Sequence, residues 1–154
     1  MAITATNFIS DILYFIKNSL TSGTYAITDP ISGTRQSGSA FIMTSYPQRL
    51  VNYPLITLKV INQKAVRAGM QTTAMDVEVT IEVRIWARNQ KEKDVLANQV
   101  YKNLRDMQFI TSTGSEANNI HDFALNSATE IDEPGEGNPK SRIMQIRYKF
   151  YDVA

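Results

Sequence analysis

The sequence MDVEVTIEVRIW, residues 75–86, alternates apolar and polar side chains from its first residue to Ile85. Successive side chains of a β-strand point to opposite faces, so this alternation predicts one long strand whose odd-numbered face is buried. The even-numbered face must then meet water or a partner. A strand with one wet face is typical of an antiparallel sheet, because parallel strands are usually covered on both sides. The rest of the chain must supply neighbouring strands and a cover for the odd face.

An apolar segment, residues 55–61 (LITLKVI), supplies the first neighbour, because each of its even positions is apolar. Residues 62–73 join this segment to the long strand and include Lys64 and Arg67 but no acidic residue. The simplest connection is an antiparallel hairpin with a long, basic tip.

A second pair of strands is expected near the C-terminus. Apolar and polar residues alternate from His121 toward Ile131, and again from Met144 to Phe150. Prolines and glycines lie between these two runs, which indicates a turn. The two runs are therefore predicted to form another antiparallel hairpin.

Two amphipathic helices are predicted, one in each half of the chain. The first covers residues 6–20, where apolar side chains recur every three or four residues. The second begins at Asn89, because Asn89 and Glu92 have the spacing of a capping box, in which each side chain accepts the backbone N–H of the other residue. Its expected apolar stripe is Val95, Leu96, Val100, Leu104 and Met107, and its expected polar side is Lys91, Lys93, Asp94, Asn98, Lys102 and Arg105. This helix should pack on the odd face of residues 75–86.

Residues 24–53 carry turn signals and only one candidate short strand, residues 40–43. About thirty residues with so little regular structure are long for a connection inside a compact domain. The segment is either a functional arm or an excursion that becomes ordered on assembly, and we favour the second. Residues 1–154 are thus expected to form a single α+β domain, with one antiparallel sheet of about four main strands and both helices on its apolar face.

Composition points to an ordinary globular domain. With 43% hydrophobic and 20% charged residues, a chain of 154 residues can bury a core without disulfides. The 16 basic and 15 acidic side chains nearly cancel, which argues against bulk nucleic acid or an anionic membrane as a partner. The chain has no cysteine, so disulfides and thiolate sites are excluded. No apolar run is long enough to span a membrane and the N-terminus lacks the basic region of a signal peptide, so use without export is expected.

Few residues are candidates for chemistry. His121 is the only histidine, so a catalytic triad or a multi-histidine metal site is not expected, and a half-buried residue at a strand start fits it better. Asp76, Glu78 and Glu82 share the even face of the long strand with Arg84. This arrangement favours cross-strand ion pairs over carboxylate catalysis or metal binding. We therefore expect no catalytic residue, metal or cofactor.

Two other groups also have simple structural interpretations. Trp86 ends the long strand, where its ring is expected to pack the end of the sheet against the second helix. Lys64 and Arg67 could contact phosphates, although two charges at a loop tip are more typical of a solvated loop.

The order of the expected elements, together with three segments, resembles the tail terminator and tail completion proteins of long-tailed bacteriophages. The segments are YPLI at 53–56, DVEVTIEVRIWA at 76–87 and KEKDVLANQVYKNL at 91–104, and the resemblance as a pattern covers residues 8–151. It implies a small α+β subunit that closes into a ring, usually of six, on the last ring of tail-tube protein. Such a ring stops tube polymerisation and offers a surface to the head connector. That role needs no catalytic residue.

The resemblance also implies partners and a location. The partners are further copies of the chain, the tail tube protein and the head connector or neck protein, without a membrane or sequence-specific nucleic acid. The location is the head-proximal end of the tail in the virion, and the host cytoplasm during assembly. A ring uses heterologous contacts, in which one patch meets a different patch of the next subunit.

Candidate contact residues lie in the basic hairpin tip, on the even strand face and in the acidic C-terminal turn. They are Lys64, Arg67, Met70, Asp76, Glu78, Glu82, Arg84, Asp132, Glu133 and Glu136. We expect either the basic tip or the acidic turn to meet its opposite in a neighbouring subunit or ring.

Other classes of protein stay open. A head–tail joining or neck protein of related fold is the nearest alternative. A nucleic-acid-binding module is more remote and would show salt-dependent affinity for DNA. A small enzyme is the most remote, because it would need a pocket with perturbed carboxylates around His121.

Overall fold

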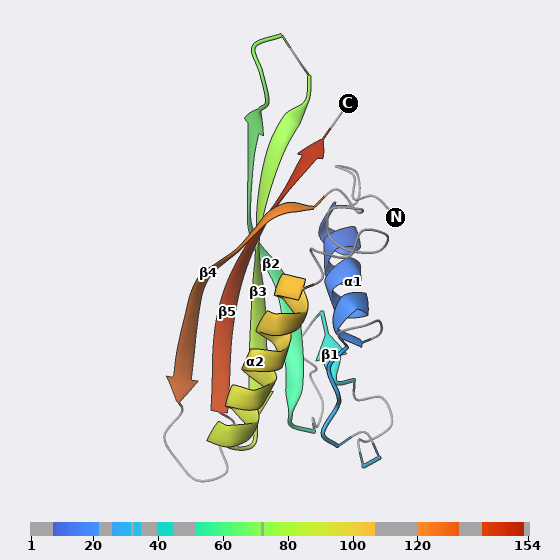
Figure 1. Ribbon diagram of the computed structural model, residues 1–154, viewed down its shortest axis with the longest axis vertical. Helices are drawn as coiled ribbons and strands as arrows, with labels where there is room; N and C mark the ends of the chain where they lie inside the picture. The colour runs from blue at the N-terminus through green and yellow to red at the C-terminus, as the bar shows by residue number, and fades with distance from the viewer. Residues whose placement is uncertain are drawn as a thin grey trace.

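Five strands form a single sheet, and two helices pack on one of its faces (Figure 1). In chain order the elements are α1 (Phe8–Thr21), β1 (Ile42–Met43), β2 (Leu55–Arg67), β3 (Met75–Ala87), α2 (Gln90–Asp106), β4 (His121–Asp132) and β5 (Lys140–Asp152). The computed structural model describes residues 8–21, 26–31, 33–34, 40–44, 52–71, 73–106, 120–132 and 140–152.

The expected α+β class is confirmed, but the sheet is mixed and has five strands rather than four. The additional strand is β1, which pairs in parallel with β2 through Ile42↔Ile56 and Met43↔Thr57. The other strand pairs are antiparallel, in the order β2-β3-β5-β4. β1 falls within the candidate short strand predicted at residues 40–43, but its place in the sheet was not predicted, because a parallel pair leaves no hairpin signal.

Parts of the segment 24–53 belong to the core. Ile27 and Ile42 are 9% and 2% exposed and lie in the main hydrophobic cluster. The backbone N–H of Ile27 donates to the carbonyl oxygen of Leu20 at 2.9 Å, which turns the chain back onto the end of α1. Residues 26–31 and 40–44 are therefore part of the domain, contrary to the expectation of an excursion. The other residues of 24–53, apart from 33–34 and 52–53, lie outside the described ones.

β3 is the central strand and pairs along its whole length with β2 on one side and β5 on the other. Its odd residues from Val77 to Ile85 are at most 3% exposed, as the alternation predicts. We call this side of the sheet the helix face and the opposite side the open face. Burying one such side chain stabilises the fold by about 1.5–3 kcal/mol, so the helix face is the main source of stability. β5 adds to it the predicted residues Met144, Ile146, Tyr148 and Phe150.

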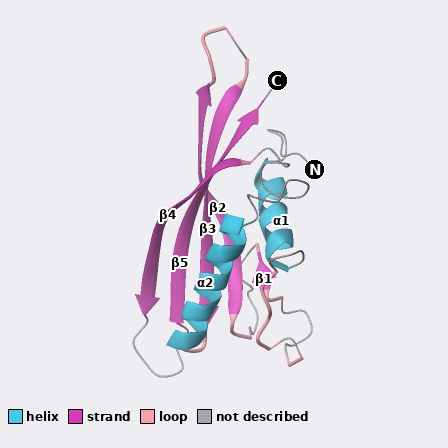
Figure 2. Cartoon of the chain, in the orientation of Figure 1, coloured by secondary structure: helices cyan, strands magenta, loops and turns pink. Residues whose placement is uncertain are grey.

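Both helices lie side by side on the helix face, as predicted (Figures 1 and 2). Two hydrogen bonds join them: the Ser19 hydroxyl donates to Asn103 Oδ1, and Asn103 Nδ2 donates to the Ser19 carbonyl oxygen, both at 3.0 Å. This pairing satisfies Asn103, a buried polar residue, and fixes the position of α1 along α2. The buried apolar side chains are Ile12, Ile16 and Leu20 of α1 and Leu96, Val100 and Leu104 of α2.

The described strands contain three β-bulges: one lies in β4 between His121 and Ala124, and the other two adjoin a single row of the sheet. The register of β2 shifts at Ile61, and the register of β4 shifts at Asn126. Both bulges adjoin the row in which Ile81 of β3 pairs with Ile146 of β5. A bulge bends its strand and increases the local twist. The strands accordingly converge at mid-length in Figure 1.

The β2–β3 hairpin is longer than predicted, and its tip is shorter. β2 continues to Arg67 and β3 begins at Met75, so residues 62–67 are strand rather than loop. The bulge at Ile61 interrupts the alternation of apolar residues, and all residues from Ile61 to Arg67 are exposed. Because the alternation is interrupted and no residue of this half is buried, the sequence pattern does not predict a strand here. This half of β2 stands beyond the two helices in Figure 1.

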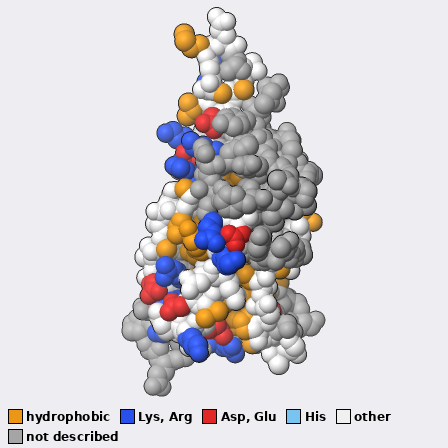
Figure 3. All heavy atoms as spheres, viewed as in Figure 1, with side chains coloured by type: hydrophobic (Ala, Val, Ile, Leu, Met, Phe, Trp, Pro, Cys, Tyr) orange, Lys and Arg blue, Asp and Glu red, His pale blue; other side chains and the backbone are white. Residues whose placement is uncertain are grey.

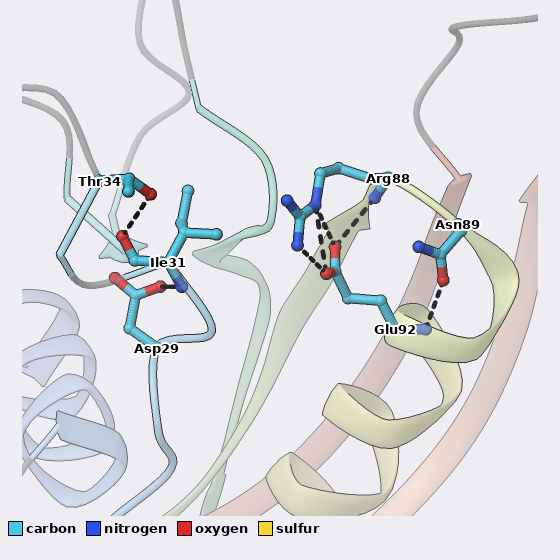
Figure 4. Close-up of polar contacts among 6 residues, drawn as sticks. All are labelled: Asp29, Ile31, Thr34, Arg88, Asn89 and Glu92. Atoms are coloured by element: carbon cyan, nitrogen blue, oxygen red, sulfur yellow. Dashed lines mark hydrogen bonds and ion pairs between the residues drawn. The ribbon is translucent and has the colours of Figure 1, made fainter.

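The N-terminus of α2 has the predicted cap. Asn89 Oδ1 accepts the backbone N–H of Glu92 at 2.9 Å (Figure 4). The reciprocal contact differs from the prediction, because Glu92 accepts the backbone N–H of Arg88 rather than that of Asn89. The carboxylate reaches one residue further back because the Arg88 guanidinium also donates to it, and such charge-assisted hydrogen bonds are strong.

Removing this cap should destabilise the protein measurably. Asn89→Ala takes away the acceptor of the Glu92 N–H, and we expect the free energy of unfolding to fall by about 1 kcal/mol in chemical denaturation. Lys91→Ala, an exposed change in the same turn, is the matched control and should change stability by less than about 0.5 kcal/mol. Equal losses in the two variants would contradict the capping role.

Candidate functional site

The even residues of β3 line the open face. Asp76, Glu78, Glu82 and Arg84 are all partly exposed there, as the alternation predicts. The side chains of Glu78 and of Arg147 on β5 are 34% and 35% exposed. Because both helices lie on the other face, this charged surface is accessible in the described part of the chain.

Opposite charges face each other across the open face. The register places Lys59 opposite Glu82 and Lys64 opposite Glu78. On the other side of β3, Arg147 Nη1 lies 3.9 Å from Glu78 Oε2. This is an ion pair of the predicted cross-strand kind. Exposed pairs typically contribute about 1 kcal/mol or less, so these charges determine surface complementarity more than stability.

Trp86 lies on the open face and not against α2. Its Nε1 donates to Thr57 Oγ1 at 3.3 Å, and the guanidinium carbon of Arg84 lies 3.8 Å from the ring centroid. Arg84 Nη2 also donates to Ser141 Oγ at 3.4 Å. The predicted packing on the second helix is wrong because Trp86 occupies an even position, and even positions point away from the helices. The ring of Trp86 instead stacks with the guanidinium group of Arg84 on the open face.

The distal half of the β2–β3 hairpin carries the most exposed large apolar side chain. Met70 is 95% exposed, and Val66 and Ile61 on β2 are 53% and 37% exposed. Figure 3 shows hydrophobic side chains at this end of the molecule. Lys64 and Arg67, predicted in a loop tip, lie on β2 itself and on opposite faces of it. The projecting hairpin therefore combines apolar and basic groups.

Of the predicted acidic turn, the structure places only the backbone of Asp132, which ends β4 at the other end of the sheet. Asp132 is the last residue of β4, and Glu133 and Glu136 lie outside the described residues. The register places the hairpin end of β3 beside the last residues of β5, and the other end of β3 beside the first residues of β5. About 40 Å of strand separates the two ends at 3.3 Å per residue. A contact between the basic hairpin and the end of β4 at Asp132 must therefore join two molecules.

Sequence analysis missed a buried ion pair between α2 and β4. The side chain of Lys93 is completely buried, and its Nζ lies 3.2 Å from Glu130 Oε1. Nζ also donates to Gln90 Oε1 at 2.9 Å. Arg142 on β5 makes a second contact with Glu130, at 3.1 Å. An ammonium group can be buried at tolerable cost only when such partners surround it.

The position of Lys93 corrects the predicted orientation of α2. Lys93 is buried in one stripe with Leu96 and Val100, whereas Val95 is 47% exposed. Lys93 precedes Leu96 by three residues and Ala97 by four, and this helical spacing indicates that the three share one face. Lysine is rarely buried, so residue type outweighed spacing in the prediction. Met107 lies outside the described residues.

Ion pairs lower the pKa of two carboxyl groups next to α2. The hydrogen bond from Lys93 lowers the pKa of Glu130. Burial raises the pKa of Glu92, but the hydrogen bonds and charge of Arg88 outweigh it and leave this pKa below the ordinary value of 4.5. A lowered pKa favours the ionised form at neutral pH. Both carboxylates therefore act as fixed charges in structural ion pairs.

Acid should weaken the fold through these carboxyl groups. A group whose pKa is lowered in the folded state stabilises the fold above its unfolded pKa and loses that contribution as pH falls through the folded pKa. We expect stability in urea denaturation to hold from pH 7 to about pH 5 and then to fall. Glu92→Gln should make the fall shallower. Unchanged stability of the native protein between about pH 5 and pH 3 would contradict this assignment.

The residues that the structure describes contain no group of three or more histidine, aspartate or glutamate side chains placed to hold a metal ion. None of the described helices is long and apolar enough to cross a membrane. His121 begins β4, as predicted, and its side chain lies outside the described ones.

The fold and the site together define an α+β protein with one covered and one open sheet face. The sequence matches no protein-family model and no curated protein.

Proposed function

We propose that this chain is a virion structural protein that caps the tail tube of a long-tailed bacteriophage as a ring. The ring ends tube polymerisation and provides the docking surface for the head connector. Its partners are further copies of the chain, six in the ring, with the tail tube protein on one side and the connector on the other. It acts in the virion, at the head-proximal end of the tail, after assembly in the host cytoplasm.

The observation that carries the proposal is the uneven cover of the sheet. Both helices pack on one face, whereas the other face presents accessible charges from β3 and β5. A ring subunit needs extended surfaces that are free for neighbours, and a charged, half-exposed sheet face suits such contacts. The resemblance of residues 53–56, 76–87 and 91–104 supports the specific assignment to a tail terminator.

The elongated shape of the subunit gives further support. The tip of the β2–β3 hairpin stands at one end of the sheet, and β4 ends and β5 begins at the other (Figure 1). A protein that joins a tube to a connector must offer different surfaces at two ends. The exposed Met70 and the basic side chains of Lys64 and Arg67 distinguish the hairpin end.

Neutralising the hairpin should weaken assembly without unfolding the subunit. We expect the double variant Lys64→Gln/Arg67→Gln to reduce tail joining in reconstitution with tails that lack the protein, because the hairpin loses its charge attraction to an acidic surface. Glutamine is preferable to glutamate, since a glutamate at position 64 would face Glu78 across the strands. The free energy of unfolding should change by less than about 0.5 kcal/mol.

Lys91→Gln, at an exposed position of α2, removes a positive charge away from the hairpin and is the control for the loss of charge. Full tail joining by the double variant would exclude the hairpin as a contact. Gold labelling of the protein in particles then tests the function itself. A label at the tube end supports the terminator, and a label on the head side of the joint would instead identify a neck protein.

A further inference from the structure

Two long edges of the sheet have no partner strand among the described residues. On one side of the sheet, β1 pairs only with Ile56 and Thr57. The outer edge of β2, the edge away from β3, therefore has no described neighbour from residue 58 to residue 67. On the other side, β4 is the last strand. Residues 61–67 of β2 and 125–130 of β4 are all exposed. Such edges present backbone N–H and C=O groups that can pair with a strand of another molecule.

The two edges differ in charge. β2 contains Lys59, Lys64 and Arg67 and no acidic residue, whereas β4 contains Asp122, Glu130 and Asp132 and no lysine or arginine. Glu130 already pairs with Lys93 inside the subunit, and the other acidic residues in the sequence of β4 are Asp122 and Asp132. Pairing of two β2 edges, or of two β4 edges, would bring like charges together. Only the unlike pair is attractive.

The two edges also match in direction. The three antiparallel pairings from β2 through β3 and β5 to β4 make β2 and β4 run in opposite directions. A second copy placed beside the first in the same orientation would therefore set its β2 antiparallel to the first copy's β4.

The edges also match in register at mid-length. The bulges at Ile61 and Asn126 adjoin one row, so both edges bend at that height, although β4 has a second bulge between His121 and Ala124. Lys59 pairs with Glu82, Glu82 with Gln145, and Gln145 with Ser127. Lys59 and Ser127 thus lie at the same height and on the same face, at opposite edges of the sheet. In adjacent copies at equal height they would be neighbours.

We propose that β2 of one subunit pairs antiparallel with β4 of a second copy, so that the sheet continues from subunit to subunit. The inference rests on the ring of the proposed function and names its contact. Unlike edges make a heterologous interface, which can close into a ring, whereas pairing of like edges would stop at a dimer.

Cysteine cross-linking tests this contact cleanly, because the chain has no cysteine of its own. Lys59→Cys and Ser127→Cys place one thiol at an exposed position on each edge. A disulfide requires Cα atoms closer than about 7 Å, so it forms only between adjacent strands. The two single variants, one with a mass tag, are mixed, concentrated and mildly oxidised. The same pair is also introduced together into tails that contain the protein.

We expect disulfide dimers that contain one copy of each variant, and a ladder of linked species when one chain carries both changes. Thr129→Cys places the thiol at the next open-face position of β4. It should link to Lys59→Cys if the two strands are shifted by two residues from the proposed register. Lys91→Cys on α2 is the control and should link to neither edge.

The inference would be overturned if β2 thiols linked only to β2 thiols and β4 thiols only to β4 thiols. It would also be overturned if Lys91→Cys formed disulfides with either edge as readily as the two edges do with each other. Absence of the β2–β4 product from both concentrated protein and tails would overturn it too. Gold labelling separates this result from the proposed function. Labelling at the tube end without β2–β4 products rejects the edge contact alone, and β2–β4 products without a label at the tube end reject the terminator alone.

Discussion

Replacing Glu130 by glutamine should destabilise the protein strongly, although the Glu130 side chain is 39% exposed. The reason is its partner: Lys93 is completely buried, and among the described residues it would keep only the neutral Gln90 as an acceptor. Stranding a buried ammonium group costs about 3 kcal/mol or more in comparable ion pairs. Urea denaturation at neutral pH measures the loss.

A second substitution separates the stranded charge from other effects of the change. Lys93→Met keeps most of the buried volume and removes the charge, so alone it should change stability little. In the Glu130→Gln background it should recover most of the lost stability. A double variant no more stable than Glu130→Gln would show that the buried charge is not the cause.

Ile81→Ala should lower the free energy of unfolding by about 2–5 kcal/mol, the usual cost of removing a buried isoleucine side chain. Ile81 is completely buried on the helix face, in the row beside which both bulges lie. Neighbouring strands hold the backbone on both sides, so the space that the substitution leaves can collapse only in part.

The next residue along β3 is the natural control. Glu82 points to the open face, and Glu82→Ala should change stability by about 0.5 kcal/mol or less. The contrast between adjacent residues follows from the two-residue period of a strand. Similar losses for the two variants would mean that both faces of β3 are buried, and the open face would then not be an assembly surface.

Sequence reasoning predicts the elements whose signal is local and long. The alternation from Met75 to Ile85 defines β3 and its buried face, and the Asn89 cap defines the start of α2. The apolar residues of β5 fall on the helix face as predicted. In these segments the period of the side chains and the burial agree, so pattern alone suffices.

The errors occur where a tertiary contact overrides the local signal. The pairing of β1 was not predicted because it depends on a parallel partner in another part of the sequence, and the bulge at Ile61 breaks the pattern of β2 halfway. Lys93 is inside because Glu130 and Gln90 neutralise and solvate it, and these partners come from the fold. The residue type of Trp86 favours packing on the helix, whereas its even position places it on the open face.

For the candidate surface, sequence reasoning places Asp76, Glu78, Glu82 and Arg84 on one face, and the structure places them there. It could not show that Lys64 and Arg67 lie on opposite faces of a strand, because the bulge and the length of the hairpin set their directions. Nor could it show that the basic hairpin and the end of β4 at Asp132 lie at opposite ends of the sheet. Those relations depend on strand order, which one sequence does not encode locally.

The central claim is that the chain closes into a ring through unlike surfaces. Native mass spectrometry, applied to the concentrated protein and to the species released from purified tails, tests it most directly. A ring predicts one closed species, six times the 17.3 kDa chain, with no larger members. A monomer in both samples, or an open series of increasing masses, would contradict the claim.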